Sequence, residues 1–448
     1  MPRVLSRRTH RASTGGGSRL ARAARHERRV IWSADPRLGV LVTAARLGPR
    51  MVHVPRLGWV VRDPRLIREV LVDHRSTSLL GEGGVGHLWT QVLGDWVEDL
   101  FDGQGHHSLR TRARDLFTEA AAAELVTPAA APVTALIRER LGAGETVDVA
   151  DLARVVVGRI VVAMLGLDAE ELAHEAAAAG TVAVTRTGRG MGVAGSAGQR
   201  SAEGGDLWDA YRLVFARGEE LAALALGTTA DTTLAPATVE RAREILVGLT
   251  RGVPEAYRSS PESTVLGRCR ALGVTEQEAT GLASLLLVAG TETAASAIAR
   301  TTALLADTGQ AARLAVASGA ERDDLLDVAV REGLRVTTPA PVIGRHITRD
   351  VTVDGHRLRA GDRVLALTYV ANTAPGALDL DRPYLPDTRH LWFGAGRHLC
   401  LGAAVARAEV RQVLSALADA GPWTVVEREA ARSVLIPTYR RLVVRRDP

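Results

Sequence analysis

The segment Glu276–Leu305 limits what this chain can fold into more than any other, because it predicts one long helix that has to be buried. Its start is marked by Thr275 and Glu278, which are spaced as in a capping box. Through residues 282–289 the helix is apolar on every side, which indicates a position inside the protein. With 448 residues, 46% of them hydrophobic and 24% charged, the chain can enclose such a helix in a globular core.

Most of the remaining chain is also predicted to be helical, with one small β region. The clearest helical periodicity is found in Pro128–Leu141, Asp151–Leu165, Pro236–Leu249, Asp323–Leu334 and Leu401–Leu417. Residues 342–370 are instead rich in Val, Ile and Thr, which favours strands. A short strand pair is expected at Met51–Val54 and Gly58–Val61, followed by a helix that begins after Asp63. We therefore predict a mainly α fold with a small β region.

The first 32 residues differ in composition from the rest. Residues 1–30 contain nine Arg and a single acid, Glu27, a local charge of +8 that leaves 5 − 8 = −3 for the rest of a chain of net charge +5. The glycine-rich stretch Ser13–Ser18 is expected to interrupt any helix there. We therefore predict an Arg-rich, disordered leader over residues 1–32 and a single domain over residues 33–448.

The composition also bears on partners and compartment. The residues after position 30 carry a net negative charge, which does not favour nucleic-acid binding. The apolar run Val155–Leu167 is interrupted by Arg159, and Leu282–Gly290 is too short to span a bilayer. The N-terminus lacks the apolar block of a signal peptide, and two cysteines cannot form a disulfide framework. We expect a cytoplasmic protein that binds neither nucleic acid nor a membrane.

A glycine-rich stretch, Thr187–Gly205, offers a rival function. Within it Gly190–Gly195 matches the G-x-G-x-x-G dinucleotide fingerprint, which requires a helix directly after it. Residues 196–205 have no apolar face and end in two glycines, so we expect no helix that could bind a pyrophosphate. The stretch is predicted to be a mobile loop.

The residues from Trp392 to Gly402 indicate a site for a single thiolate ligand. Cys400 precedes a good helix former, and at a helix N-terminus the dipole and nearby N–H donors favour the thiolate. With no second Cys nearby, the spacing does not fit a tetrahedral zinc site, and an iron–sulfur cluster needs four ligands. A haem needs one proximal protein ligand. Cys269, the other cysteine, is expected to be a buried apolar residue.

The pattern Phe-x-x-Gly-x-x-x-Cys-x-Gly, from Phe393 to Gly402, resembles the haem-ligand signature of the cytochrome P-450 family. The resemblance extends over residues 51–448 and is to members of the bacterial soluble type. It implies the P-450 fold, with haem b (iron protoporphyrin IX) buried between the long helix and the Cys-ligand loop. The contacts that it implies in this loop are Cys400 as the iron ligand, with Phe393, Gly394, His398 and Gly402 around the haem.

The long helix carries polar residues where the resemblance places oxygen activation. After the apolar run, residues 289–293 add an acid and two hydroxyls, which are costly to bury without a partner or a function. Thr293 can bond back to the carbonyl of Ala289 and open the turn locally. The pentapeptide resembles the family's oxygen-activating kink, in which Glu292 and Thr293 would relay protons and Ala289 and Gly290 would border the haem. A structural helix bent by its hydroxyl groups is the alternative.

The resemblance also implies cations for the two haem propionates. His106 and Arg110 lie one turn apart on a predicted helix and match the family's His-x-x-x-Arg, while Arg345 and His398 match the remaining partners. Arginine suits this role because its planar fork can bond both oxygens of a carboxylate. Each of these residues taken singly would more often be a surface charge.

A second helix carries Glu332 and Arg335, which are three residues apart and can pair. Taken alone they form a common solvated ion pair. Their place between the long helix and the Cys loop resembles the family's Glu-x-x-Arg motif, whose role is structural. The following Thr337-Thr338-Pro339 departs from the commoner Pro-Pro pair, where members vary with substrate.

Together these features indicate a haem-thiolate monooxygenase. The resemblance implies that it uses dioxygen to hydroxylate or epoxidise a small organic substrate, with electrons from a separate ferredoxin or flavodoxin and its reductase. The sequence contains no Lys, so all 56 of its Lys and Arg residues are Arg, which is typical of proteins from GC-rich genomes. This composition associates the protein with bacterial natural-product biosynthesis. Three alternatives stay open at this point: oxidative coupling or cyclisation, peroxide-driven oxidation, and a non-catalytic haem sensor. The exposed arginines expected to receive an acidic electron donor are Arg112, Arg114, Arg397, Arg407 and Arg411.

Overall fold

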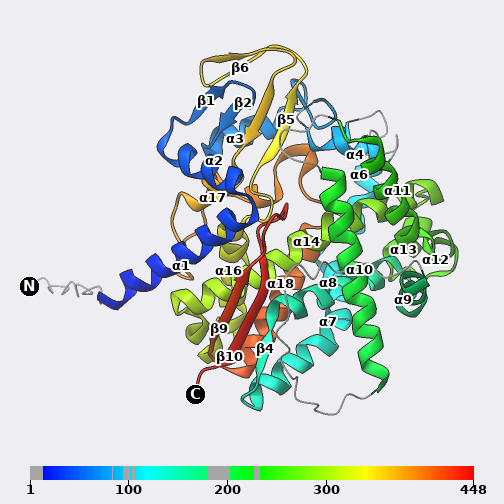
Figure 1. Ribbon diagram of the computed structural model, residues 1–448, viewed down its shortest axis with the longest axis vertical. Helices are drawn as coiled ribbons and strands as arrows, with labels where there is room; N and C mark the ends of the chain where they lie inside the picture. Colours follow the sequence, from blue (N-terminus) through cyan, green and yellow to red (C-terminus); the bar gives the residue numbers. More distant parts are fainter. Residues whose placement is uncertain (1–13, 83, 94–100, 103–105, 179–201, 227–232) are drawn as a thin grey trace, which may run out of the picture.

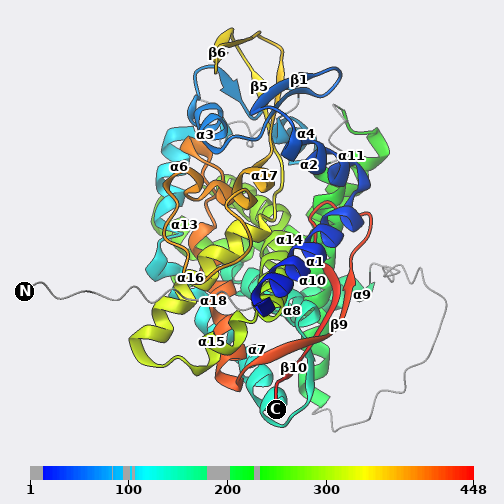
Figure 2. The ribbon, with the colours of Figure 1, turned by 90° about the vertical axis from the view of Figure 1, so that its left-hand side faces the viewer.

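The computed structural model describes residues 14–82, 84–93, 101–102, 106–178, 202–226 and 233–448. Helices predominate, and small sheets lie at opposite ends of the molecule (Figures 1 and 2). The predicted mainly α class with a small β region is therefore confirmed. The fingerprint-like Gly190–Gly195 lies outside the described residues.

Helices occur along the whole length of the described chain. In its first half they are α1 (Thr14–Ala34), α2 (Pro36–Leu47), α3 (Pro64–Val72), α4 (Val85–Leu93), α6 (His106–Asp115), α7 (Glu119–Gly142), α8 (Val149–Leu165), α9 (Ala169–Ala178) and α10 (Ala202–Leu226). In its second half they are α11 (Pro236–Thr250), α12 (Val253–Ser259), α13 (Val265–Ala271), α14 (Glu276–Thr308), α15 (Gln310–Val316), α16 (Gly319–Thr337), α17 (Thr368–Thr373) and α18 (Ala403–Ala420). Short 3-10 turns are η1 (Pro386–Thr388), η2 (Leu391–Phe393) and η3 (Gly396–His398).

The strands form three sheets. Their bounds are β1 (Met51–Val54), β2 (Gly58–Val61), β3 (Thr77–Ser78), β4 (Thr146–Asp148), β5 (Ile343–Ile347), β6 (Val351–Val353), β7 (His356–Leu358), β8 (Arg363–Ala366), β9 (Trp423–Ala430) and β10 (Tyr439–Arg446). The largest sheet has the order β1-β2-β8-β5-β3, with β2 and β8 parallel and the other pairs antiparallel. The others are β4-β10-β9 and the hairpin β6-β7. In the largest sheet, Arg345 of β5 lies opposite Val364 of β8.

Local sequence signals account for several of these elements. The predicted strand pair is confirmed residue for residue in β1 and β2. The Asp63 side chain accepts the backbone N–H groups of Arg65 and Leu66, which caps α3 as expected. The capping box of Thr275 and Glu278 is also present at the start of α14.

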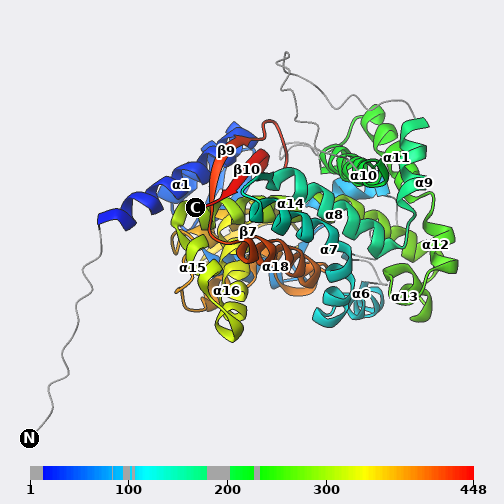
Figure 3. The same cartoon turned by 90° about the horizontal axis from the view of Figure 1, so that it is seen from below.

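Helix α14 runs through the middle of the molecule, as its apolar surface predicts. It packs against α8, α10, α16 and α18 (Figure 3), and almost all of its side chains from Ala279 to Leu305 are buried. Helix α18 contacts both α7 and α14. The loop that precedes α18 therefore lies close to α14. This arrangement brings the two segments singled out in the sequence to the same part of the core.

The prediction of a disordered leader is wrong for residues 14–32, because they form most of α1. This helix packs on α14 and β9 and buries Ala23, Glu27, Val30 and Ile31, which recur with helical spacing. The gain from burying this face outweighs the low helix propensity of the glycines at its start. Gly204 and Gly205 likewise lie within α10 rather than in the predicted loop.

Two helices of the described chain, α7 and α14, are long and apolar enough to cross a membrane by length and composition alone. In α14, 83% of the most apolar window is buried inside the protein, as in a core helix, against 39% in α7. The apolar surface of α14 is therefore explained by its place in the core.

Candidate functional site

A cavity of about 230 Å³ lies between α14 and the loop that leads into α18. Helix α14 contributes Leu286, Ala289, Gly290, Thr293, Ala294 and Ala297 to its walls. The loop and α18 contribute Trp392, Phe393, Gly394, Cys400, Gly402, Val405, Ala406 and Glu409. The lining, which is mostly apolar, is completed by Phe117, three residues of α8, and Leu334, Pro339, Ala340 and Ile343. The structure thus brings together seven of the residues that the sequence predicted for one site: Ala289, Gly290, Thr293, Phe393, Gly394, Cys400 and Gly402.

The backbone of the loop holds Cys400 at the edge of this cavity. Its N–H donates to the carbonyl of Phe393 at 2.9 Å, which closes the loop ahead of α18. Gly394 and Gly396 have φ values of 78° and 70°, which residues with a Cβ seldom adopt. A Cβ at Gly396 would also lie 2.9 Å from the carbonyl oxygen of Leu71, so that position admits only glycine.

Cys400 lines the cavity, and its side chain is exposed there. Burial raises its pKa above the usual value, and Glu409 adds to this, while the N–H of Gly402 and the charges of Arg110 and Arg407 lower it. The expectation that nearby N–H groups and positive charges favour the thiolate is confirmed for Gly402, Arg110 and Arg407, but burial outweighs them, so the pKa is raised overall. A cation bound to the sulfur would favour the thiolate.

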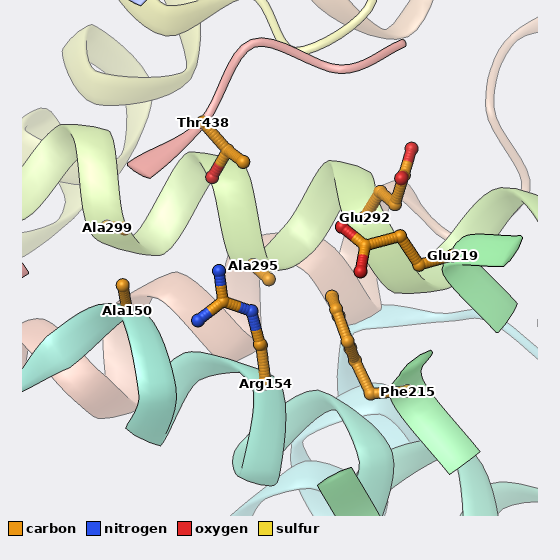
Figure 4. A pocket seen from close by; sticks show the side chains of 8 residues that line it. All are labelled: Ala150, Arg154, Phe215, Glu219, Glu292, Ala295, Ala299 and Thr438. Carbon is orange, nitrogen blue, oxygen red and sulfur yellow. The ribbon is translucent and has the colours of Figure 1, made fainter. Parts of the chain in front are cut away.

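The polar residues Thr293 and Glu292 of α14 line two different cavities. The hydroxyl of Thr293 donates to the carbonyl oxygen of Ala289 at 2.9 Å, as predicted, and faces the large cavity. Gly290 leaves open space where a Cβ would project. Glu292, by contrast, lines a separate small cavity on another side of α14 together with Glu219 of α10 (Figure 4).

The predicted cations differ in their surroundings. Arg345 is buried, and its Nη1 donates to the carbonyl of Gly344 at 2.9 Å. Its Nε has no hydrogen-bond partner among the described residues. Burial lowers its pKa to about 10, while the charge of Asp102 acts in the opposite direction. Arg345 is therefore a buried cation with a donor to spare.

Arg110 and His398 are already engaged with protein groups. Arg110 donates to the carbonyl oxygens of Arg397 and Leu399, at 2.9 and 2.6 Å, so it supports the Cys400 loop. His398 Nε2 lies 2.7 Å from the carbonyl of Phe101 and 3.1 Å from Asp102 Oδ1. His106 lies at the start of α6, but its side chain is outside the described residues.

The sequence analysis missed two acids near this site. Asp102 accepts bonds from Ser78 and Leu79 as well as from His398. Burial alone would raise its pKa, but these hydrogen bonds lower it to about 2. No local pattern indicates Asp102, because its partner His398 is 296 residues away.

Glu409, the second missed acid, lines the large cavity from α18, and burial raises its pKa to about 8. Glu409 lies four residues after Val405, on the buried face of α18. An acid at a position where the helical pattern predicts an apolar residue could have indicated a functional role. Cys269 is buried, as predicted, and burial raises its pKa to about 12.

Comparison with known proteins shows which family the chain resembles. The family model described as Cytochrome P450 matches residues 321–420. The chain is 33% identical over 194 residues to a putative cytochrome P-450, YjiB, of Bacillus subtilis, covering 41% of this chain and 47% of that protein. Over these parts of its length the chain is similar to the cytochrome P-450 family. It is also similar to a P-450 relative named vitamin D3 dihydroxylase from Streptomyces griseolus, with 34% identity over 208 residues, 44% of this chain and 50% of that protein.

These alignments show that the chain spans about half the length of the curated relatives it matches. Solved structures agree over a longer part of the chain. The versatile cytochrome P-450 enzyme CYP109B1 from Bacillus subtilis superimposes with a TM-score of 0.66 at 20% identity, over 90% of this chain and 98% of that one. This likeness shows the P-450 fold.

The family implies a haem-thiolate cofactor, and the residues of the large cavity fit such a group. Cys400 is a single sulfur ligand that faces the cavity, and Gly290 and Gly402 leave open space where side chains would stand. Arg345 offers a donor that the described residues leave unused, as a buried carboxylate such as a propionate requires. Trp392, on the cavity wall, likewise has a buried Nε1 without a partner among the described residues.

Proposed function

We propose that this protein is a haem-thiolate monooxygenase that uses dioxygen to hydroxylate or epoxidise a small organic substrate. The observation that supports this most directly is that the thiol of Cys400 and the hydroxyl of Thr293 open into the same apolar cavity from opposite walls. In such a site the bound haem supplies dioxygen activation, and the protein supplies the ligand, the protons and the exclusion of water.

The residues of the chain have distinct roles in this proposal. Cys400 would ligate the iron of haem b, and Phe393, Gly394 and Gly402 would line the site around it. Ala289 and Gly290 would border the haem from α14, where Gly290 leaves open space. The cations that hold the propionates are His106, Arg110, Arg345 and His398, of which Arg345 has an unused donor and Arg110 and His398 also support the loop.

Thr293 and Glu292 move protons toward the site. The hydroxyl of Thr293 donates to the carbonyl oxygen of Ala289, and Thr293 lines the large cavity. Because a hydroxyl is both a donor and an acceptor, it can accept a proton from a group inside the protein and pass one into the cavity. Burial raises the pKa of Glu292 to about 8, with a further rise from Glu219, so Glu292 is a protonated acid near neutral pH.

The cavity lining indicates an apolar substrate. Leu286, Ile343 and the α8 residues Ile160, Val161 and Met164 offer no charge to it. Relatives named for natural-product and vitamin oxidation, such as 20-oxo-5-O-mycaminosyltylactone 23-monooxygenase of Streptomyces fradiae at 35% identity over 166 residues, support a role in bacterial natural-product biosynthesis.

Electrons come, in this proposal, from a separate ferredoxin or flavodoxin with its reductase. Of the arginines expected to receive it, three pair with acids of the chain: Arg112 with Glu278, Arg407 with Glu119, and Arg411 with Asp323 and Asp327. An acidic donor must compete with these pairs, so its docking should weaken steeply with salt. We further propose that residues 33–448 act as one catalytic domain, with α1 packed on it, in the cytoplasm and without a nucleic-acid or membrane partner.

The test uses the full chain, expressed with iron and a porphyrin precursor. The reduced protein should give the long-wavelength carbon monoxide band of a thiolate-ligated haem, and Cys400→Ser should lose that band. With an electron donor, a product heavier by one oxygen atom supports monooxygenation. A product lighter by two hydrogens would indicate coupling or cyclisation, turnover with peroxide alone would indicate a peroxygenase, and bound haem with no product from a broad substrate panel would indicate a sensor. A chain that binds no haem overturns the proposal.

A further inference from the structure

Helix α1 has an exposed side that consists mainly of arginine. Arg22, Arg25, Arg29 and Trp32 follow one another at i, i+3, i+7 and i+10, so they lie along one side of the helix over about 15 Å. All four are exposed, Trp32 by 41%. Figures 1 and 3 show α1 at the edge of the molecule, with its N-terminal end projecting past the neighbouring elements. These four residues are called the basic face below.

The opposite side of α1 holds the helix on the rest of the protein. Ala23, Glu27, Val30 and Ile31 are buried there, and Glu27 pairs with the buried Arg300 of α14. Glu27 is also the one acid in the sequence of α1. The acid of this helix is therefore turned inward, away from the basic face.

The charge of the basic face is not neutralised within the part of the chain that the structure describes. There, the ion pairs of α1 are made by His26 and Glu27, and none is made by the arginines of the basic face. The acids of β9, against which α1 packs, pair with Arg440 and Arg441 of β10. Residues 1–13 contain no Asp or Glu in their sequence. The positive charge of the basic face is thus available to a partner outside the chain.

The size of this surface and the charge of the rest of the protein indicate the kind of partner. The basic face is one helix wide, and the residues after position 30 carry a net negative charge. A membrane or a nucleic-acid duplex presents negative charge over a wider area, so it would also meet the negative part of the protein. The apolar side of α1 is buried, so this helix cannot insert among lipids as an amphipathic helix does. A narrow acidic segment of another protein meets neither obstacle.

We propose that the basic face of α1 binds an acidic helix of a partner protein, whose carboxylates repeat at i, i+3 and i+7. Each arginine then donates charge-assisted hydrogen bonds to one carboxylate, and Trp32 covers an apolar residue at the end of the row. The surface uses a different helix from the arginines expected to receive the electron donor, which lie on α6, on α18 and in the Cys400 loop. The inference therefore goes beyond the proposed reaction and does not depend on it.

The test titrates the full chain with a labelled synthetic peptide and follows fluorescence anisotropy. The peptide is an alanine-rich helix with Glu at i, i+3 and i+7 and Leu at both ends of that row. Saturable binding is expected, and it should weaken by about tenfold or more between roughly 50 and 500 mM salt. Combining Arg22→Gln, Arg25→Gln and Arg29→Gln should weaken binding at low salt by about tenfold or more. Trp32→Ala should weaken it by about threefold without changing its salt dependence.

Two matched controls separate a specific surface from general attraction between opposite charges. Combining Arg65→Gln, Arg357→Gln and Arg440→Gln removes the same charge from side chains that are 73%, 72% and 65% exposed elsewhere on the protein. This control variant should bind the peptide within about twofold of the wild type. A peptide of the same composition, with its Glu residues scattered around the helix, should bind the wild type about tenfold more weakly.

The outcomes that overturn the proposal are distinct. Equal losses in the two triple variants, equal binding of the ordered and the scattered peptide, or no binding at low salt would each show that the basic face does not recognise an acidic helix. Phosphatidylglycerol vesicles and a short DNA duplex are titrated in the same way. Binding of either through the basic face, without binding of the peptide, would assign the face to lipid or nucleic acid instead.

Sedimentation tests the remaining occupant, a second copy of this chain. A dimer that is lost when the three arginines of the basic face are replaced would assign the face to self-association and overturn the proposal, whereas the same oligomeric state in the wild type and this variant supports it. None of these measurements requires haem or turnover. A protein that never forms an oxidised product would therefore contradict the proposed function while leaving this test intact.

Discussion

Glu292 and Thr293 follow one another in α14 but face two different cavities. Thr293 lines the large cavity that Cys400 also lines, whereas Glu292 lines a separate small cavity together with Glu219. Helix geometry produces this division, since consecutive side chains point about 100° apart around the axis. The two residues should therefore give different phenotypes when they are replaced.

Replacing Thr293 should uncouple electron consumption from product formation. Thr293→Val keeps the shape of the side chain but removes the hydroxyl that faces the cavity, so proton delivery should slow and the product formed per NAD(P)H should fall by about tenfold or more. Thr291→Val is the matched control, because Thr291 makes the same bond to the carbonyl four residues earlier but lies outside the large cavity. Equal coupling in the wild type and Thr293→Val would contradict the proton relay, and Thr293→Ser should restore coupling.

Replacing Glu292 should change how stability depends on pH. Burial, and then Glu219, raise the pKa of Glu292 to about 8 from its ordinary 4.5. Below pH 4.5 the carboxyl is protonated in both states and its full contribution is present, and that contribution is lost as the pH rises through 8. The free energy of unfolding should therefore fall across this range by an amount on the order of a few kcal/mol, and it should fall less in Glu292→Gln. Urea unfolding at several pH values measures this, with the exposed Glu240→Gln as control; parallel curves for Glu292→Gln and the wild type would rule it out.

The sequence predicts the parts of this site that depend on local patterns. The capping box, the apolar surface of α14, the Thr293 to Ala289 bond and the Cys400 loop each follow from residues close together in the chain. Their assembly into one cavity followed from the family resemblance, because the spacing of distant segments is not a local property.

Contacts between distant segments explain what the sequence analysis missed. Asp102 acquires its role from His398, 296 residues later, and α1 is helical because it packs on α14 and β9. The separate direction of Glu292 was also missed, although the rotation of about 100° per residue in a helix already separates it from Thr293. The sign of the pKa change at Cys400 depends on burial, which only the packed fold reveals.

The ion pair of Glu332 and Arg335 should be worth far more than a surface pair. Two bonds of 2.7 and 2.8 Å join them, both side chains are 2% exposed, and Arg335 also donates to the carbonyls of Asn372 and Gly376. Glu332→Gln should lower the free energy of unfolding by about 3–5 kcal/mol, because it leaves a buried guanidinium without its counter-charge.

Urea unfolding of the full chain measures this effect. Glu244→Gln is the control, since Glu244 pairs with Arg241 at the same i,i+3 spacing on the surface and should cost less than about 1 kcal/mol. Similar losses in the two variants would show that burial adds nothing to the Glu332–Arg335 pair.

The Arg-rich N-terminal region should contribute to stability through α1. Glu27 pairs with Arg300 of α14, whose side chain is fully buried and also donates to the carbonyl of Pro437. Glu27→Gln should therefore lower the free energy of unfolding by about 3–5 kcal/mol, since it leaves the charge of Arg300 buried without its partner. Glu145→Gln, which breaks the exposed pair with Arg140, should have almost no effect. If Glu27→Gln unfolds at the same urea concentration as the wild type, α1 is not held by this pair, and it must depend on its other contacts, such as those of Val30 and Ile31 and the His26–Asp307 pair.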